Sequence, residues 1–151
     1  MRQMELYLHI PFCVKKCPYC DFLSLPATED TQKEYVEALI REISFYGPRC
    51  SDYIVTTVYI GGGTPSWLLE DHIARIMGAV HRSFTVASDA EISIECNPGT
   101  VTAHKLSVYR EAGISRISIG CQSADNTELK LLGRIHTYDQ FLKTYTLARE
   151  H

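Results

Sequence analysis

Three cysteines stand within eight residues near the start of the 151-residue chain, where Cys13, Cys17 and Cys20 form a C-x3-C-x2-C pattern. Thiolates are soft ligands, and three of them on one loop suit an iron–sulfur cluster or a zinc ion. In a 4Fe–4S cluster, three thiolates leave the fourth iron open for a chelating ligand. A structural zinc site needs a fourth protein ligand, and the nearby His9 lies on a predicted strand, where its side chain need not face the loop. The pattern favours an iron–sulfur cluster, with zinc or unligated thiols as the alternatives.

A glycine-rich turn, Gly61-Gly62-Gly63-Thr64-Pro65, follows a predicted strand. Glycines let a ligand approach the backbone closely, so that peptide groups can bind its polar atoms. Taken alone, the pattern is also typical of an ordinary strand-to-helix turn. It does not match a phosphate-binding loop, because G-x-x-x-x-G-K-[ST] is absent.

Three polar residues in later segments are further candidates for ligand binding. Glu95 ends a predicted strand within Glu95-Cys96-Asn97-Pro98, where a carboxylate suits a cationic or hydroxyl-bearing ligand. Gln122 follows the next strand, and Arg134 stands a few residues later in Leu131-Leu132-Gly133-Arg134. A guanidinium can grip a carboxylate with two hydrogen bonds. Each residue could equally be a solvated polar group at a strand end or on the surface.

Hydrophobic periodicity predicts strands that alternate with helices. Strands with β-branched or alternating apolar residues are expected over 4–10, 54–60, 90–95 and 115–120. The run over 54–60 is expected to be buried on both faces. Helices are expected within 28–48, 66–80, 102–112 and 125–132 and from 138 onward, with Thr31-x-x-Glu34 and Ser66 as candidate N-terminal caps. The last helix is expected to place four large residues on one side: Tyr138, Phe141, Leu142 and Tyr145.

This alternation predicts an α/β fold with a parallel sheet. Four strand–helix units do not close an eight-stranded barrel. Residues 1–151 are therefore expected to be the N-terminal part of a longer barrel, with the rest of the barrel and a C-terminal domain absent. Each motif follows the carboxyl end of a predicted strand, which is the end that holds active sites in parallel α/β barrels.

Composition excludes several classes of protein. Hydrophobic residues make up 45% and charged residues 22% of the chain, with a net charge of −3, so a nucleic acid is not expected as a partner. No apolar run approaches the roughly 20 residues of a membrane span, and no signal-peptide pattern is present, so a cytoplasmic location is expected. In that reducing compartment, six cysteines favour metal ligands or buried residues over disulfides. Cys50, Cys96 and Cys121 are expected to be buried.

The cysteine triad, with Tyr19 before its third cysteine, is similar to the signature of the radical S-adenosylmethionine (SAM) superfamily. The longer strings Tyr7-Leu-His9-Ile-Pro-Phe-Cys13 and Cys17-Pro-Tyr-Cys20-Asp-Phe22 resemble the oxygen-independent coproporphyrinogen III oxidase family, which includes heme chaperones. The resemblance covers essentially the whole chain, because the later motifs fall in the family's order. It implies the N-terminal part of a partial (β/α) radical SAM barrel.

The resemblance also implies cofactors, namely a 4Fe–4S cluster on the three cysteines and SAM bound beside it. In this family the glycine-rich motif receives the SAM amino group, Glu95 contacts SAM, Gln122 contacts its ribose and Arg134 pairs with its carboxylate. The implied cofactor site is completed by further residues of the same motifs: Tyr7, Tyr19, Phe22, Gly62, Gly63 and Thr64. Such a cluster reduces SAM to methionine and a 5′-deoxyadenosyl radical.

Phe22 distinguishes the two branches of this family. Oxidases that act on coproporphyrinogen III have a fourth cysteine at this position and a longer N-terminal extension, whereas here the position is Phe22 and Cys13 lies near the start. The resemblance therefore implies a heme chaperone that binds heme or a porphyrin and transfers heme to a respiratory protein. The oxidase, which would make the protein an enzyme, and a zinc-binding α/β domain without SAM are the alternatives.

Overall fold

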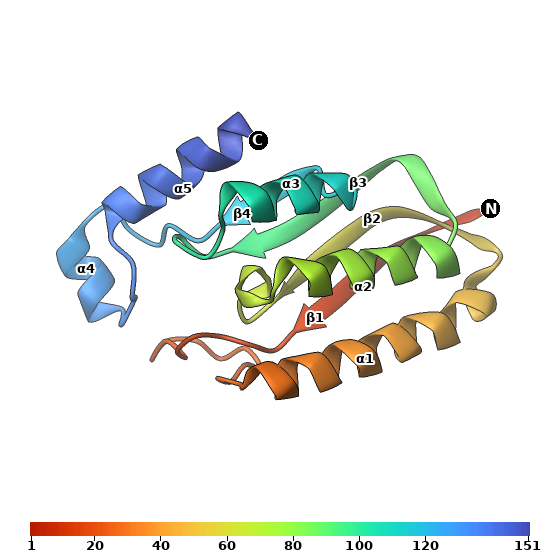
Figure 1. The fold of residues 1–151 in the computed structure, drawn as a ribbon, viewed down its shortest axis with the longest axis horizontal. Coiled ribbons are helices and arrows are strands. Elements are labelled where there is room, and N and C mark those ends of the chain that lie inside the picture. Colours follow the sequence, from red (N-terminus) through yellow and green to blue (C-terminus); the bar gives the residue numbers. More distant parts are fainter.

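Four parallel strands alternate with helices in the computed structural model, which describes residues 1–151 (Figure 1). The strands are β1 (Arg2–Ile10), β2 (Tyr53–Gly62), β3 (Val86–Cys96) and β4 (Arg116–Ile119). They pair in the order β1-β2-β3-β4, and every pairing is parallel. The predicted α/β class is confirmed, and β1 and β4 are the two edges of the sheet.

The helices lie mainly on one face of the sheet. The helical segments are α1 (Glu29–Tyr46), α2 (Glu70–Ser83), α3 (Ala103–Glu111), α4 (Asn126–Leu131) and α5 (Tyr138–Glu150), with short 3-10 turns η1 (Gly47–Cys50) and η2 (Pro65–Trp67). Helices α1, α2 and α3 run side by side over this face, and α4 lies beyond the carboxyl ends of the strands (Figure 1). None of the helices combines the length and the apolar character that crossing a membrane requires.

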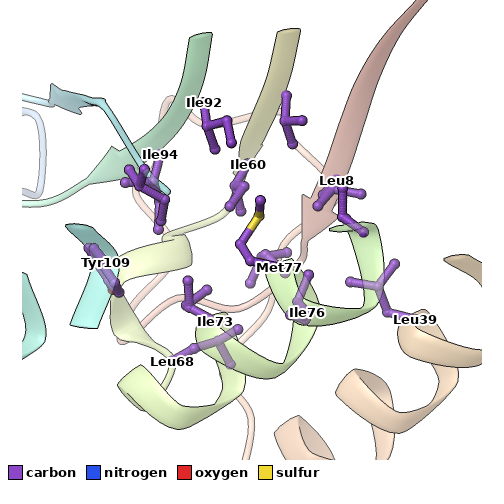
Figure 2. Close-up of a cluster of buried hydrophobic side chains, with 14 of the residues drawn as sticks. Leu8, Leu39, Ile60, Leu68, Ile73, Ile76, Met77, Ile92, Ile94 and Tyr109 are labelled. Carbon is purple, nitrogen blue, oxygen red and sulfur yellow. The ribbon is translucent and has the colours of Figure 1, made fainter. Parts of the chain in front are cut away.

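The hydrophobic core fills the space between the sheet and these three helices. Strand residues such as Ile60 and Ile94 point toward Ile73, Ile76 and Met77 of α2, and all five are fully buried (Figure 2). Burying one such side chain contributes about 1.5–3 kcal/mol to stability. The core thus fixes the sheet and, with it, the positions of the strand ends.

The opposite face of the sheet is polar. Alternate residues along the strands, such as Tyr7, Tyr59, Ser93 and Glu95, point away from the helices because successive side chains in a strand face opposite sides. The expectation that the 54–60 run is buried on both faces is wrong, since no helix covers this second face and Tyr59 is only half-buried.

The two candidate N-terminal caps, Thr31 and Ser66, are wrong, although the first helix lies within its expected bounds of 28–48. Helix α1 begins at Glu29, and its N-terminal cap is Thr28, whose Oγ1 accepts a hydrogen bond from the Thr31 backbone N–H at 3.3 Å. Ser66 does not cap α2, because Pro65 starts the η2 turn, which buries Ser66, and α2 begins only at Glu70. Proline fixes a φ angle that suits the first position of a helical turn, so a separate short turn begins at Pro65. The hydrophobic periodicity did not distinguish this turn from the helix that follows it.

Helix α5 is present, but its expected apolar side is not buried. Tyr138, Phe141 and Tyr145 stack along it with ring centroids 5.8 and 6.3 Å apart. Leu142 and Tyr145 are exposed, and the buried residue of this helix is Thr144. The spacing of the apolar residues predicts the helix correctly, but it does not indicate whether another element covers that side.

Candidate functional site

A cavity of about 240 Å³ opens at the carboxyl ends of the strands. It lies between the loop that follows β1 and the ends of β2, β3 and β4. Of the residues predicted to form a site, all except Tyr7 line it. Its walls are Cys13, Lys15, Cys17, Tyr19, Cys20, Phe22, Gly62, Gly63, Thr64, Glu95, Cys96, Asn97, Ser118, Gly120, Gln122 and Arg134.

The loop that bears the three cysteines is held at both ends. The Leu25 N–H donates to the Pro11 carbonyl at 2.9 Å, and the Cys13 N–H donates to the Leu25 carbonyl at 3.1 Å. Within the loop, the Cys20 N–H donates to the Cys17 carbonyl at 3.0 Å, which makes a tight turn. Cys13 is buried, Cys17 and Cys20 are half-buried, and none of the three forms a disulfide.

The donor set suits a cluster better than one metal ion. No group of three or more His, Cys, Asp or Glu side chains is close enough to hold a single ion. His9 does not supply a fourth zinc ligand, because its Nδ1 lies 3.1 Å from the Tyr7 hydroxyl and its Nε2 lies 2.9 Å from the Leu23 carbonyl oxygen. A cubane presents a separate iron to each thiolate, so its ligands stand farther apart than those of one ion.

The glycine-rich turn packs against the cysteine loop. The Gly63 N–H donates to the Ile10 carbonyl at 2.8 Å, and the Thr64 N–H donates to the Phe12 carbonyl at 2.7 Å. A Cβ at Gly63 would lie 2.9 Å from Cys13 Sγ and 2.6 Å from the Phe12 oxygen. Gly62 has a φ of 122°, in the region that glycine favours. Gly63 is therefore required for the close approach of the turn to the Cys13 thiol, and Gly62 for the backbone conformation of the turn.

Glu95 is fixed by two hydrogen bonds at the end of β3. Its Oε1 accepts from the Tyr59 hydroxyl at 2.8 Å, and its Oε2 accepts from the Gly62 N–H at 3.0 Å. Burial raises the pKa of Tyr59, and the hydrogen bond to Glu95 raises it further. Tyr7 lies outside the cavity but stacks on Tyr59 with ring centroids 6.2 Å apart, so it touches the site only through its neighbour.

Gln122 has an unusual backbone conformation for a residue other than glycine. Its φ is 65°, in the left-handed region, which costs roughly 1–3 kcal/mol for such a residue. A Cβ at Gly120 would lie 2.9 Å from the Gln122 Nε2 atom. The side chain therefore folds back over Gly120 toward the cavity, and a larger residue at 120 would displace it.

Arg134 crosses the mouth of the cavity and joins its two sides. Its Nη1 lies 3.7 Å from Cys17 Sγ and 3.4 Å from the Tyr19 hydroxyl. Its Nη2 donates to Asn97 Oδ1 at 2.9 Å and to the Gly120 carbonyl at 3.3 Å. The Arg134 Nε is buried and has no hydrogen-bond partner. A buried donor of this kind calls for an acceptor, so Arg134 has one unmet hydrogen bond beside the cavity that it lines.

Sequence reasoning missed several residues of the cavity wall. Asn97 links Arg134 to Thr64, because its Nδ2 donates to Thr64 Oγ1 at 2.9 Å. Lys15, Ser118 and Gly120 also line the cavity. The feature of the sequence that could have identified Asn97 is its position in the same strand-end motif as Glu95.

The remaining cysteines differ in burial. Cys96 is buried in the core, as expected, and burial raises the pKa of its thiol. The expectation that Cys50 and Cys121 are buried is wrong, since both are half-buried. Cys50 belongs to the η1 turn at the end of α1, and Cys121 lies in the loop after β4, where less of the core surrounds them.

Comparison with known proteins identifies relatives over nearly the whole chain. It is 44% identical over 146 residues to heme chaperone HemW of Escherichia coli (strain K12), which covers 96% of this chain and 39% of that protein. It is 38% identical over 151 residues to heme chaperone HemW of Haemophilus influenzae, covering 97% and 39% of the two chains. The chain thus spans about two fifths of the length of these relatives.

The fold also matches a solved structure, coproporphyrinogen III oxidase (HemN) from Escherichia coli, described as a radical SAM enzyme. The TM-score is 0.91 at 32% sequence identity, over 99% of this chain and 35% of that one. The resemblance found in the sequence and the α/β fold with parallel strands are both confirmed. The model of the Radical SAM superfamily matches residues 7–151. The chain therefore belongs to the radical SAM superfamily.

Proposed function

We propose that this chain holds a 4Fe–4S cluster through Cys13, Cys17 and Cys20 and binds SAM in the adjoining cavity. The observation that supports this most is the meeting of three free thiols and Arg134, whose Nε has no hydrogen-bond partner, at one cavity. When bound, a reduced cluster supplies the electron that cleaves the carbon–sulfur bond of SAM. Membership of the superfamily implies both cofactors.

The roles proposed for the other residues follow from their contacts. Glu95 is an acceptor for a cationic or hydroxyl group, and it is held in place by Tyr59 and Gly62. Gln122 presents an amide that can bind a ribose hydroxyl. Arg134 binds the SAM carboxylate through Nε, the one guanidinium nitrogen that has no partner in the protein.

The aromatic residues of the site have supporting roles in the proposal. Tyr19 and Phe22 flank the third cysteine and shield the cluster from water, whereas Tyr7 supports Tyr59 from outside the cavity. Gly62, Gly63 and Thr64 present the turn that receives the SAM amino group.

A reconstitution experiment tests the cluster. We expect the anaerobically reconstituted chain to hold iron and labile sulfide, and Cys13→Ala, Cys17→Ala or Cys20→Ala to lose both. Cys50→Ala is the matched control, because Cys50 is a half-buried free thiol outside the cavity, and it should keep the wild-type content. Zinc without sulfide in the wild-type chain would contradict the proposal.

We further infer that the chain is the N-terminal part of the radical SAM domain of a heme chaperone, which binds heme and passes it to a respiratory protein. The names of the relatives support this inference, as does Phe22 at the position where an oxidase has a cysteine. A cytoplasmic location belongs to the proposal, because the proposed cluster needs reduced thiols and all six cysteines are free.

Oxidation of coproporphyrinogen III is the second candidate function, and the fold match to the oxidase supports it. The two are separated by incubating a full-length protein with coproporphyrinogen III, SAM and a reductant, and by titrating the same protein with heme. We expect stoichiometric heme binding without protoporphyrinogen formation. Robust protoporphyrinogen formation would favour the oxidase instead.

A further inference from the structure

Asn97 occupies a central position in the polar network of the cavity. Its Oδ1 accepts a hydrogen bond from Arg134 Nη2 at 2.9 Å, and its Nδ2 donates to Thr64 Oγ1 at 2.9 Å. One amide thus connects the glycine-rich motif after β2 with Arg134, 37 residues farther along the chain. The hydrogen bond to Asn97 is the shortest that the Arg134 guanidinium makes, since the others measure 3.3 to 3.7 Å.

The Asn97 side chain stands on a backbone that is itself fixed. The Asn97 N–H donates to Ser66 Oγ at 3.2 Å, and its carbonyl oxygen accepts from Thr100 Oγ1 at 2.7 Å. Ser66 is a buried residue of the η2 turn, so the first bond ties the end of β3 to the segment after β2, and the second fixes the loop that follows β3. The amide cannot rotate without breaking bonds on both of its sides. It therefore holds the guanidinium in one orientation.

Charge explains why an amide suits this position better than a carboxylate. A carboxylate at 97 would form an ion pair with Arg134 and neutralise it, and it would repel any anion that approached Nε. An amide oxygen accepts the same hydrogen bond without a formal charge. Arg134 therefore keeps its positive charge, while its buried Nε remains free for an acceptor.

We propose that Asn97 is a positioning residue that orients Arg134 to select a ligand with a carboxylate, and so selects SAM over analogues that lack this group. The inference rests on the proposed function, in which Arg134 binds the SAM carboxylate. Asn97 itself holds the guanidinium and leaves its charge available, whereas Arg134 makes the contact with the ligand.

The test compares two ligands, SAM and decarboxylated SAM, whose dissociation constants are measured by calorimetry with the reconstituted chain. Wild type should bind SAM more tightly. Asn97→Asp keeps both hydrogen-bonding positions, since the Thr64 hydroxyl can donate to the new carboxylate, but it introduces a negative charge. We expect this variant to bind SAM about tenfold or more weakly, with binding of decarboxylated SAM unchanged or tighter. Asn126→Asp, the same change at an exposed helix start outside the cavity, should behave as wild type.

A double-mutant cycle supplies a second readout. Asn97→Ala should weaken SAM binding about tenfold in the wild-type background but barely affect it in an Arg134→Gln background, because the residue acts through Arg134. If Asn97→Ala does not fold, Asn97→Asp is combined with Arg134→Gln in its place, and its effect on SAM binding should likewise vanish.

The outcomes separate the inference from the proposed function. Equal affinity of the wild-type chain for both ligands would overturn the proposed role of Arg134. If wild type prefers SAM and Asn97→Asp keeps that preference in full, the proposed role of Asn97 is overturned. The proposed contact between Arg134 and the SAM carboxylate is then unaffected. Equal losses of both ligands in Asn97→Asp would show general damage to the cavity and would also overturn the positioning role.

Discussion

Gly133 packs directly against Pro18, so that a Cβ added to Gly133 would come within 2.6 Å of Pro18 Cδ. Gly133 also has a φ of 71°, where glycine is favoured. The contact presses the segment before Arg134 onto the cysteine loop. We expect Gly133→Ala to lower the free energy of unfolding by roughly 1–3 kcal/mol and to reduce the iron and sulfide bound on reconstitution. Urea unfolding and metal analysis measure the two effects.

Gly99→Ala is the matched control for this prediction. Gly99 has a similar φ of 81°, but an added Cβ there would meet no atom within 4 Å. The Gly99→Ala variant should therefore lose stability through backbone strain alone and keep its full iron content. Equal iron losses in the two variants would show that the contact with Pro18 has no part in holding the cysteine loop.

His136 makes stability depend on pH. It is buried, with Nε2 3.2 Å from the Cys121 carbonyl oxygen. Burial lowers the pKa of His136, the hydrogen bond to Cys121 opposes that shift, and the positive charge of Arg134 lowers the pKa further. The unfolded chain, with the ordinary pKa of 6.5, binds the proton more readily than the folded chain. This contribution to stability is therefore complete above that pH and is lost as the pH falls below it.

The measurement is the free energy of unfolding at about pH 7.5 and about pH 5.5, on either side of the ordinary histidine pKa. When the pH falls from the higher to the lower value, the free energy of unfolding should decrease more in wild type than in His136→Gln. His104→Gln, a change at a side chain that is 75% exposed, should keep the wild-type pH dependence. An unchanged pH dependence in His136→Gln would refute the assignment.

Lys105 is a buried cation that joins the η2 turn to the loop after β3. Its Nζ donates to the Ser66 carbonyl at 2.9 Å and to the Thr100 carbonyl at 3.3 Å. Burial lowers the pKa of Lys105. Lys105→Met keeps the length of the side chain but leaves both carbonyls without this donor, so we expect a loss of roughly 1–3 kcal/mol in unfolding free energy. Lys33→Met on the exposed side of α1 is the control, and a similar loss there would rule out the buried hydrogen bonds as the cause.

Strand β4 has a free edge, and a cavity of about 750 Å³ runs beside it, lined in part by Ile117, Ile119 and Tyr145. Unpaired strand edges next to apolar surface promote association. We expect sedimentation velocity to show larger species as the concentration of the chain rises, and Tyr145→Lys to reduce them. Phe45→Lys alters a similarly exposed aromatic residue on α1 that lies outside both edge cavities and should have little effect. A chain that stays monomeric throughout would contradict this prediction.

The site could largely be predicted from the sequence because the fold is parallel. Once Cys13, Gly62, Glu95 and Gln122 are each placed after a strand, a parallel sheet brings them to the same edge. Periodicity alone was enough to order the strands and helices. The glycine-rich turn also lies at the cavity as expected, and the structure adds that the space beside Gly63 is taken by the cysteine loop.

Other features depend on tertiary contacts that no local pattern reveals. Asn97 is joined to Thr64 and Arg134, 33 and 37 residues away, so its role emerges only when three segments meet. The left-handed backbone of Gln122 is held by its surroundings against its own preference. Ser66 has the residue type of a helix cap, but the preceding proline turns it into the core.

The contact between Arg134 and Cys17 spans 117 residues of chain. Ribosomes add about 5–20 residues per second, so the three thiols emerge on the order of ten seconds before the guanidinium that later lies over them. Early in that interval all three cysteines have been synthesised, whereas β3 and β4, whose ends form walls of the cavity, have not. A cluster delivered to the nascent chain would find its ligands without a cavity, whereas one delivered after release would have to enter past Arg134. The order of synthesis therefore brings Arg134 to the cysteine loop long after the loop itself has been made.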